Sequence, residues 1–184
     1  MKKIAIVVGH WPTSIDGGAF NANMNMSEFD FNNSLAPKLA VRVREAGYIP
    51  IIVYRETYDL LPGQVNDTGA DLCLSLHCNA FDENPHGSEV LYHHSSSKGK
   101  QLAQCIQNGV VECLGLPDRG IKPIDYDYVG GAGDKGGWLV EKTAMPCVII
   151  EPFFIDSDES LKLALRKLDD LAKAIANAVT AYYS

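Results

Sequence analysis

Short apolar runs alternate with longer segments of helical periodicity along the chain. Three of the runs are apolar almost throughout, as is typical of strands that are buried on both faces of a sheet. They are Ile4–Val8, Leu72–Leu76 and Cys147–Ile150. Ile49–Tyr54 is a fourth predicted strand, and Glu89–Tyr92 is predicted to lie at the edge of the sheet.

Apolar residues in the intervening segments recur every three or four positions, which is the pattern of amphipathic helices. The first predicted helix follows an N-cap at Asn33 or Ser34. Pro37 then falls in the first turn, where its missing N–H is tolerated, and Gly47 ends the helix. A second helix is predicted over residues 102–114.

The clearest helical pattern lies near the end of the chain, where one apolar stripe runs from Leu161 to Val179. Asp156 and Glu159 are predicted to cap its start. Residues 125–137 follow neither period and carry five glycines, so we expect a surface loop there. Strands that alternate with helices predict an α/β fold: a single domain, residues 1–184, with a twisted, mainly parallel sheet and helices on both faces.

Length and composition agree with this fold and exclude several classes of protein. A chain of 184 residues, 46% hydrophobic and 21% charged, is long enough for one core and is not disordered or collagen-like in composition. The net charge of −7 argues against a nucleic acid or an anionic membrane as partner. Only five apolar residues separate Lys3 from Gly9, too few for a signal peptide, and no run is long enough to span a membrane. We therefore expect a cytoplasmic monomer without membrane insertion.

The cysteines do not have the pattern of a disulfide framework or a thiolate zinc site, because they are five in number and form no Cys-x-x-Cys pair. Four of them lie among apolar neighbours, where a thiol packs as a small hydrophobic group. Cys78 follows His77 and is therefore an alternative nucleophile, although a packed thiol is the favoured interpretation.

Each of the three buried runs leads into an ionisable residue. The run that begins at Ile4 leads through a glycine to His10, the second leads directly to His77, and the third leads directly to Glu151. Glu28 lies just before the first predicted helix, at the same edge of the sheet. Ligands of open α/β sheets bind outside the carboxyl ends of the strands. We therefore expect these four side chains to converge there.

Two histidines and a carboxylate are typical ligands of a catalytic zinc site, which leaves its fourth position to water. A second carboxylate beside the metal is needed to take a proton from that water. The residues alone do not decide which of Glu28 and Glu151 is the ligand and which is the base. Three of the four residues also have an ordinary structural interpretation: Glu28 as a carboxylate at a helix start, and His10 and His77 as histidines bonded to a backbone carbonyl. Glu151 is harder to explain in this way, because an unpaired carboxylate in the core of a sheet is costly. Their joint occurrence favours the metal site.

Eight short motifs follow one another in order along almost the whole chain. They are Val8–His10, Asp16–Ala19, Ser27–Glu28, Asn33–Ala36, Leu74–Ala80, Gly87–Tyr92, Arg119–Gly120 and Pro146–Phe154. Together they resemble the motifs of the zinc-dependent N-acetylmuramoyl-L-alanine amidases of the amidase-3 type, and most closely those of the catalytic domains of phage endolysins in that group.

The resemblance implies one zinc ion per chain, held by His10, Glu28 and His77, with Glu151 as the catalytic glutamate. It implies hydrolysis of the amide between the lactyl group of N-acetylmuramic acid and L-alanine of the peptidoglycan stem peptide. Without a signal peptide, such an enzyme accumulates in the cytoplasm and reaches the cell wall after release. That location suits an endolysin and, somewhat less well, a sporulation lysis enzyme.

Two alternatives to this function stay open on the sequence. One is another zinc amide hydrolase or deacetylase with a substrate outside the wall, and the other is a wall-fragment binding module that has lost catalysis. Trp11 stands where the family usually has a glycine, a departure that bears on substrate preference. The roles of Trp11, Asn79, His93 and residues 125–137 toward a substrate are also left open.

Overall fold

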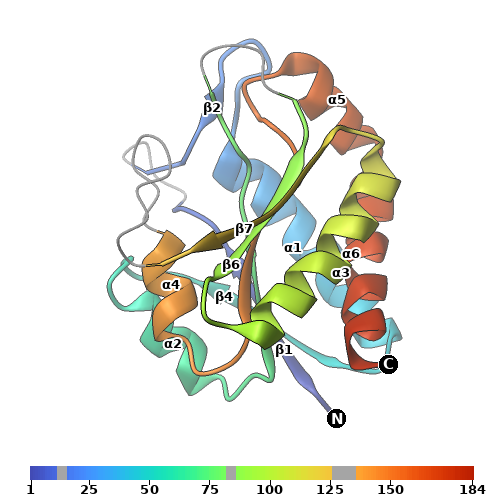
Figure 1. Cartoon of the computed structure of the whole chain (residues 1–184). Helices are drawn as coiled ribbons and strands as arrows, with labels where there is room; N and C mark the ends of the chain where they lie inside the picture. The colour runs from blue at the N-terminus through green and yellow to red at the C-terminus, as the bar shows by residue number, and fades with distance from the viewer. Residues whose placement is uncertain (12–15, 82–85, 126–135) are drawn as a thin grey trace.

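The computed structural model describes residues 1–11, 16–81, 86–125 and 136–184 (Figure 1). Its central sheet has the strands β1 (Lys3–Val8), β4 (Ile49–Tyr54), β5 (Leu72–Leu76), β6 (Ser88–His93), β7 (Asp118–Ile124) and β8 (Cys147–Glu151). Their order is β4-β1-β5-β8-β6-β7, and neighbours are parallel except for β8 and β6. The predicted α/β fold with a mainly parallel sheet is thereby confirmed.

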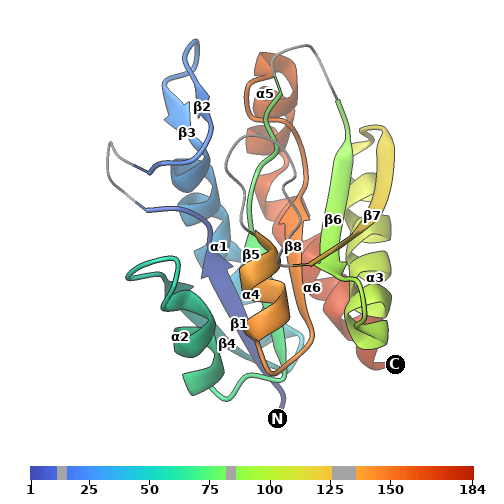
Figure 2. The same ribbon diagram turned by 60° about the vertical axis from the view of Figure 1, so that its left-hand side comes forward.

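Helices cover both faces of this sheet (Figure 2). One face carries α1 (Glu28–Glu45), α3 (Ser97–Leu114) and α6 (Leu168–Tyr183), and the other carries α2 (Leu61–Asp67) and α4 (Gly136–Lys142). The core accordingly has two parts, and β1, β5 and β8 contribute alternate side chains to each. This burial on both faces explains why their sequences are apolar at successive positions.

The first helix starts earlier than the sequence predicts. Its N-cap is Ser27 rather than Asn33 or Ser34. The Ser27 hydroxyl accepts the backbone N–H of Asp30 at 3.1 Å, and the Asp30 carboxylate accepts the N–H of Ser27 at 3.1 Å. This reciprocal pair satisfies donors at the helix start. Pro37 is therefore an interior residue, and burial of one face of α1 against the sheet outweighs the backbone hydrogen bond that the proline removes.

The sheet has one strand more than the sequence predicts. β7 pairs with β6 and forms the edge, so β6, the predicted edge strand, lies inside the sheet between β7 and β8. The sequence of β7 does not have the pattern of a strand, because Arg119, Gly120, Lys122 and Pro123 interrupt the alternation of apolar and polar positions. Charged residues and proline are common on edge strands, whose outer side is unpaired.

The apolar stripe near the end of the chain belongs to two helices rather than one. α5 (Asp158–Arg166) ends at Lys167, and α6 follows directly. The N-cap of α5 is Ser157 instead of Asp156, and its hydroxyl accepts the N–H of Ser160 at 3.3 Å. The periodicity does not show this break, because the apolar residues of α5 and α6 follow one another at almost uniform helical intervals.

The remaining short elements surround the carboxyl end of the sheet. A hairpin of β2 (Phe20–Asn21) and β3 (Met26–Ser27) leads into α1, and both chain termini lie at the opposite end of the molecule (Figure 1). Most of the loop predicted over residues 125–137 lies outside the described residues. In the part of the chain that the structure describes, no helix is long and apolar enough to cross a membrane.

Candidate metal centre

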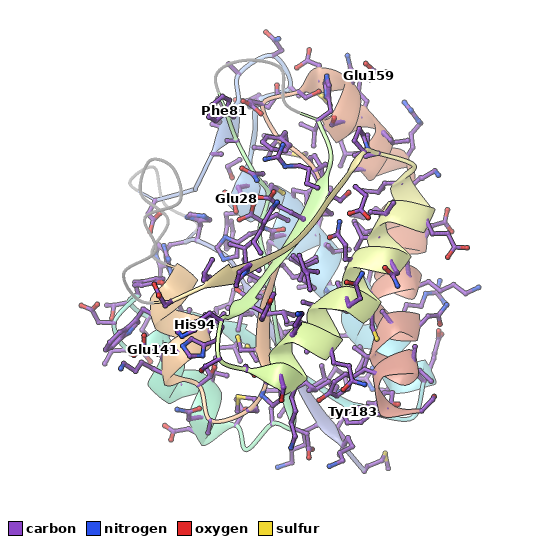
Figure 3. All side chains as sticks on the ribbon, viewed as in Figure 1. Glu28, Phe81, His94, Glu141, Glu159 and Tyr183 are labelled. Atoms are coloured by element: carbon purple, nitrogen blue, oxygen red, sulfur yellow. The ribbon has the colours of Figure 1, made fainter. Side chains whose placement is uncertain are left out.

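Three of the four predicted site residues meet at the carboxyl end of the sheet. β1 and β5 are parallel neighbours, so His10 and His77, which follow them, reach the same edge. Glu28 is the first residue of α1 and lies in the upper half of the molecule, far from Tyr183 (Figure 3). One ligand atom of each of the three side chains lies within 4.8 Å of the others. Together they could hold one metal ion.

The Glu28 carboxylate is the centre of this cluster and is only 3% exposed. One oxygen lies 3.0 Å from His77 Nδ1 and accepts the N–H of Cys78 at 2.8 Å. The other lies 3.1 Å from His10 Nε2 and accepts the N–H of Ala19 at 3.2 Å. Burial alone would raise the pKa of Glu28, but the hydrogen bonds and charge of the two histidines lower it well below its ordinary value. The site thus stabilises the ionised carboxylate that a metal requires.

Two glycines make room for these ligands. A Cβ on Gly9 would stand 2.8 Å from the ring of His77, and one on Gly18 would stand 2.6 Å from a carboxylate oxygen of Glu28. His10 itself has a positive φ of 66°, an uncommon backbone conformation for a residue other than glycine. The backbone is therefore shaped around the three side chains, as expected for a site whose function depends on their geometry.

The carboxylate of Asp16, to which the sequence analysis gave no role, contacts the ring nitrogen of His10 that faces away from Glu28. Asp16 Oδ1 lies 3.0 Å from His10 Nδ1, which directs His10 Nε2 toward Glu28. The second oxygen of Asp16 accepts a hydrogen bond from the guanidinium of Arg55, a residue that is only 7% exposed. Histidine ligands of metals commonly donate their other ring N–H to a carboxylate in this way, which fixes the tautomer and ring orientation. The only sequence signal was the place of Asp16 in one of the eight motifs.

Glu151 lies beside the cluster without being part of it. The His77 N–H donates to the carbonyl of Ile150 at 3.0 Å, so Glu151 stands next to His77 in the register of the two parallel strands. Residues in register on adjacent strands project from the same face. Glu151 is 7% exposed, and its charge contributes to the raised pKa of the neighbouring Cys78 thiol. Because the described cluster contains Glu28 instead of Glu151, the geometry favours Glu28 as the ligand.

Asn79 links the ends of several strands. Its side-chain amide donates to Glu89 Oε1 at 2.7 Å, and its carbonyl oxygen accepts the N–H of Ala80 at 2.9 Å. Its backbone N–H donates to the carbonyl of Phe153 at 3.0 Å, and its backbone carbonyl accepts the N–H of Ile155 at 2.9 Å. These contacts hold the extensions of β5 and β8 together and give Asn79 a structural role.

Two other residues considered in the sequence have simpler surroundings. Cys78 is buried, and burial together with the nearby charges of Glu28 and Glu151 raises the pKa of its thiol, so it is packed as a protonated group. His93 Nδ1 lies 2.9 Å from the hydroxyl of Ser95 on the polar surface after β6. Neither arrangement is that of a nucleophile or a metal ligand.

Comparison with known proteins identifies relatives along almost the whole chain. The family model for N-acetylmuramoyl-L-alanine amidase matches residues 4–181. The N-acetylmuramoyl-L-alanine amidase LytC of Bacillus subtilis is 32% identical over 178 residues, which are 91% of this chain and 33% of that protein. An uncharacterized cell wall amidase of Bacillus anthracis is 26% identical over 99% of this chain and 35% of its own length. The chain thus spans about a third of the length of these curated relatives.

Solved structures share the fold. The catalytic domain of the CD27L endolysin, described as targeting Clostridia difficile, is 28% identical, with a TM-score of 0.81 and coverage of 98% of both chains. An N-acetylmuramoyl-L-alanine amidase from Clostridium difficile 630 is 23% identical, with a TM-score of 0.83, and the match covers 99% of this chain and 96% of that one.

Proposed function

The chain belongs to the N-acetylmuramoyl-L-alanine amidase family, and on that basis we propose that it cleaves the amide between N-acetylmuramic acid and L-alanine in peptidoglycan. One observation carries the proposal for this chain itself. His10, Glu28 and His77 offer three ligand atoms within 4.8 Å of one another, and Glu151 stands beside His77 on the next strand. The arrangement combines a metal site with a separate carboxylate, as metal-assisted amide hydrolysis requires.

We propose zinc as the metal, one ion per chain, on His10, Glu28 and His77. Two imidazole nitrogens and a carboxylate oxygen are a usual ligand set for catalytic zinc and leave one position open. The contacts of Glu28 support the assignment, since the groups around its oxygens include the two imidazoles that a cation would draw together. When bound, zinc polarises the scissile carbonyl and increases the acidity of water.

Glu151 then serves as the general base and acid. Its carboxylate takes a proton from the attacking water and afterwards gives that proton to the departing amine of L-alanine. Its burial beside His77 shields this carboxylate from bulk water next to the proposed zinc ligands. Asp16 and Arg55 hold His10 in orientation throughout, so the ligand geometry does not have to form during the reaction.

The substrate follows from the family, and cell-wall lysis is the proposed role. LytC is named as an amidase, and the CD27L domain is described as the catalytic part of an endolysin. A wall-fragment binding module without catalysis would have no need of a buried carboxylate at Glu151. A deacetylase or amide hydrolase with another substrate would retain the same ligands, so substrate products must distinguish it.

The direct test is digestion of purified cell walls by the zinc-loaded protein, followed by mass analysis of the released fragments. We expect a fall in turbidity and free stem peptides whose N-terminus is L-alanine, and both should disappear after zinc is removed with a chelator. Release of acetate without stem peptides would instead indicate a deacetylase. Binding to the walls without any release would indicate the binding module.

A further inference from the structure

Four ionisable side chains lie in one row across the sheet at its active edge. His77 and Glu151 are neighbours in the register of β5 and β8, and Glu151 is directly opposite Glu89 in the antiparallel pair of β8 and β6. Arg119 lies at the irregularity of β7 that faces Glu89. Because neighbouring strands are about 4.8 Å apart, the backbone of Arg119 is about 10 Å from that of Glu151 along this row.

The row contains two carboxylates side by side, Glu151 and Glu89, and Arg119 on the neighbouring strand balances the charge of Glu89. Carboxylates directly opposite each other on paired strands repel. Glu89, which is only 9% exposed, accepts the Nε–H of Arg119 at 2.8 Å and the amide of Asn79 at 2.7 Å. Its charge is thereby matched on the side away from Glu151, and the ion pair fixes the place of Arg119.

Arg119 is fixed by contacts with Phe154, Gly87 and Glu89, and its guanidinium still has N–H donors for a ligand. Its guanidinium lies over the ring of Phe154 at 5.0 Å from the centroid, and its stem packs against Gly87, where a Cβ would stand 2.8 Å from Arg119 Cγ. The side chain is nevertheless 38% exposed. Glu89 engages Nε, and within the described ranges no hydrogen bond is made by the terminal nitrogens, which therefore have donors for another acceptor. A fixed guanidinium of this kind suits a carboxylate, which it can bind with two parallel hydrogen bonds.

We infer that Arg119 binds a free carboxylate of the stem peptide on the far side of the cleaved amide. This inference rests on the proposed function. An extended peptide advances about 3.3 Å per residue. The separation of about 10 Å between the backbones of Glu151 and Arg119 therefore corresponds to the second or third stem residue, counted from the L-alanine at the cleaved amide. Arg119 is therefore a specificity residue, which selects stems whose carboxylate at that position is free over stems in which it is amidated.

The test compares four soluble N-acetylmuramoyl tripeptides, with the carboxylates of the second and third residues free or amidated, singly and together. For the wild-type enzyme we expect amidation of one of the two carboxylates, the one that Arg119 binds, to lower kcat/KM by about 10-fold or more. The loss should come from a higher KM, because a hydrogen bond to a charged group is lost in substrate binding. In Arg119→Gln that preference should disappear, because free and amidated stems should then be cleaved at similar kcat/KM. Arg119→Lys should retain part of the preference.

Controls separate this role from a structural one. Lys122→Gln removes a positive charge from the same strand and should retain the full preference. Where Arg119→Gln folds poorly because Glu89 is left unpaired, the double variant Glu89→Gln/Arg119→Gln removes both charges and permits the same comparison of substrates.

Three outcomes would overturn the inference. A wild-type enzyme that cleaves all four substrates equally, or an Arg119→Gln enzyme that keeps the wild-type preference, excludes this subsite while the proposed function stands. A zinc-loaded wild-type enzyme that cleaves none of them and also releases no stem peptides from purified walls contradicts the proposed function itself, and the inference with it.

Discussion

The two ends of the sheet hold charged groups in opposite environments. At the carboxyl end, the structure buries carboxylates and a guanidinium, namely Glu28, Glu89, Glu151 and Arg55. At the amino end, Lys2 and Asp71 form an ion pair at 2.8 Å, and their side chains are 55% and 33% exposed. β6 and β7 run antiparallel to β8, so they bring their starting residues to the edge where the other strands finish.

This difference locates the function of the molecule. A buried charge is costly unless partners compensate for it, whereas an exposed ion pair contributes little to stability. Around Glu28 the partners are imidazoles, which a metal ion can also bind, whereas around Glu89 they are an arginine and an amide that hold it permanently. Changes at the carboxyl end should therefore affect metal binding and catalysis, and equivalent changes at the amino end should affect neither.

The largest effect is expected from removal of a metal ligand. His77→Ala should lower the zinc content from about one per chain to near zero and abolish wall lysis. It should also remove the stabilisation that zinc gives the folded chain, because the unfolded chain has no formed site. Metal analysis and thermal melting with and without zinc measure this, with Asp71→Asn as the control that retains zinc. A zinc content near one in His77→Ala would exclude His77 as a ligand.

The next effect distinguishes the roles of Glu28 and Glu151. Glu151→Gln cannot accept a proton, so its turnover should fall by about 10²–10⁴-fold while its zinc content stays normal. Glu28→Gln should weaken zinc binding first, and part of its activity should return with excess zinc. Zinc stoichiometry and lytic rate are measured for both variants. If Glu151→Gln loses zinc and Glu28→Gln retains it, the two roles are reversed.

A smaller effect is expected from the carboxylate behind His10. Asp16→Asn keeps the shape of the side chain but weakens the hydrogen bond that orients the imidazole, so zinc affinity should fall by about 10- to 100-fold. Competition with a chelator of known affinity gives the dissociation constant. Excess zinc should restore most of the lysis. An unchanged constant would show that Asp16 is not needed to hold His10.

The smallest effect is expected at the amino end. Lys2→Gln should lower the melting temperature by no more than about 2 °C and leave zinc content and lysis unchanged. The hydrogen bond from Lys2 lowers the pKa of Asp71, so any stabilisation by the pair is present above the ordinary pKa of aspartate. It is lost as the pH falls through the lowered value. The difference in melting temperature between wild type and Lys2→Gln should therefore vanish in acid, and a loss of zinc in this variant would contradict the separation of the two ends.

The start of α1 and the edge strand β7 depend on contacts that the apolar periodicity of the sequence does not indicate. α1 starts where Ser27 and Asp30 form a capping box, and these polar residues add nothing to the apolar periodicity. For this reason the periodicity places Pro37 in the first turn of the helix, whereas the structure places it in the interior. β7 is a strand because it pairs with β6, although its own residues show no alternation. In both cases the decisive interaction is a hydrogen bond made by a polar group, and apolar patterns do not report it.

The buried strands and the ionisable residues at their ends can be predicted from the amino-acid sequence. Runs that are buried on both faces are apolar at almost every position, so the ionisable residues after them, His10, His77 and Glu151, stand out. The contacts that hold those residues in place depend on how the chain folds. The contacts of Asp16 with Arg55 and of Glu89 with Arg119 join segments that are 39 and 30 residues apart. Such contacts form only when strand order and register bring the segments together, and no local pattern encodes them.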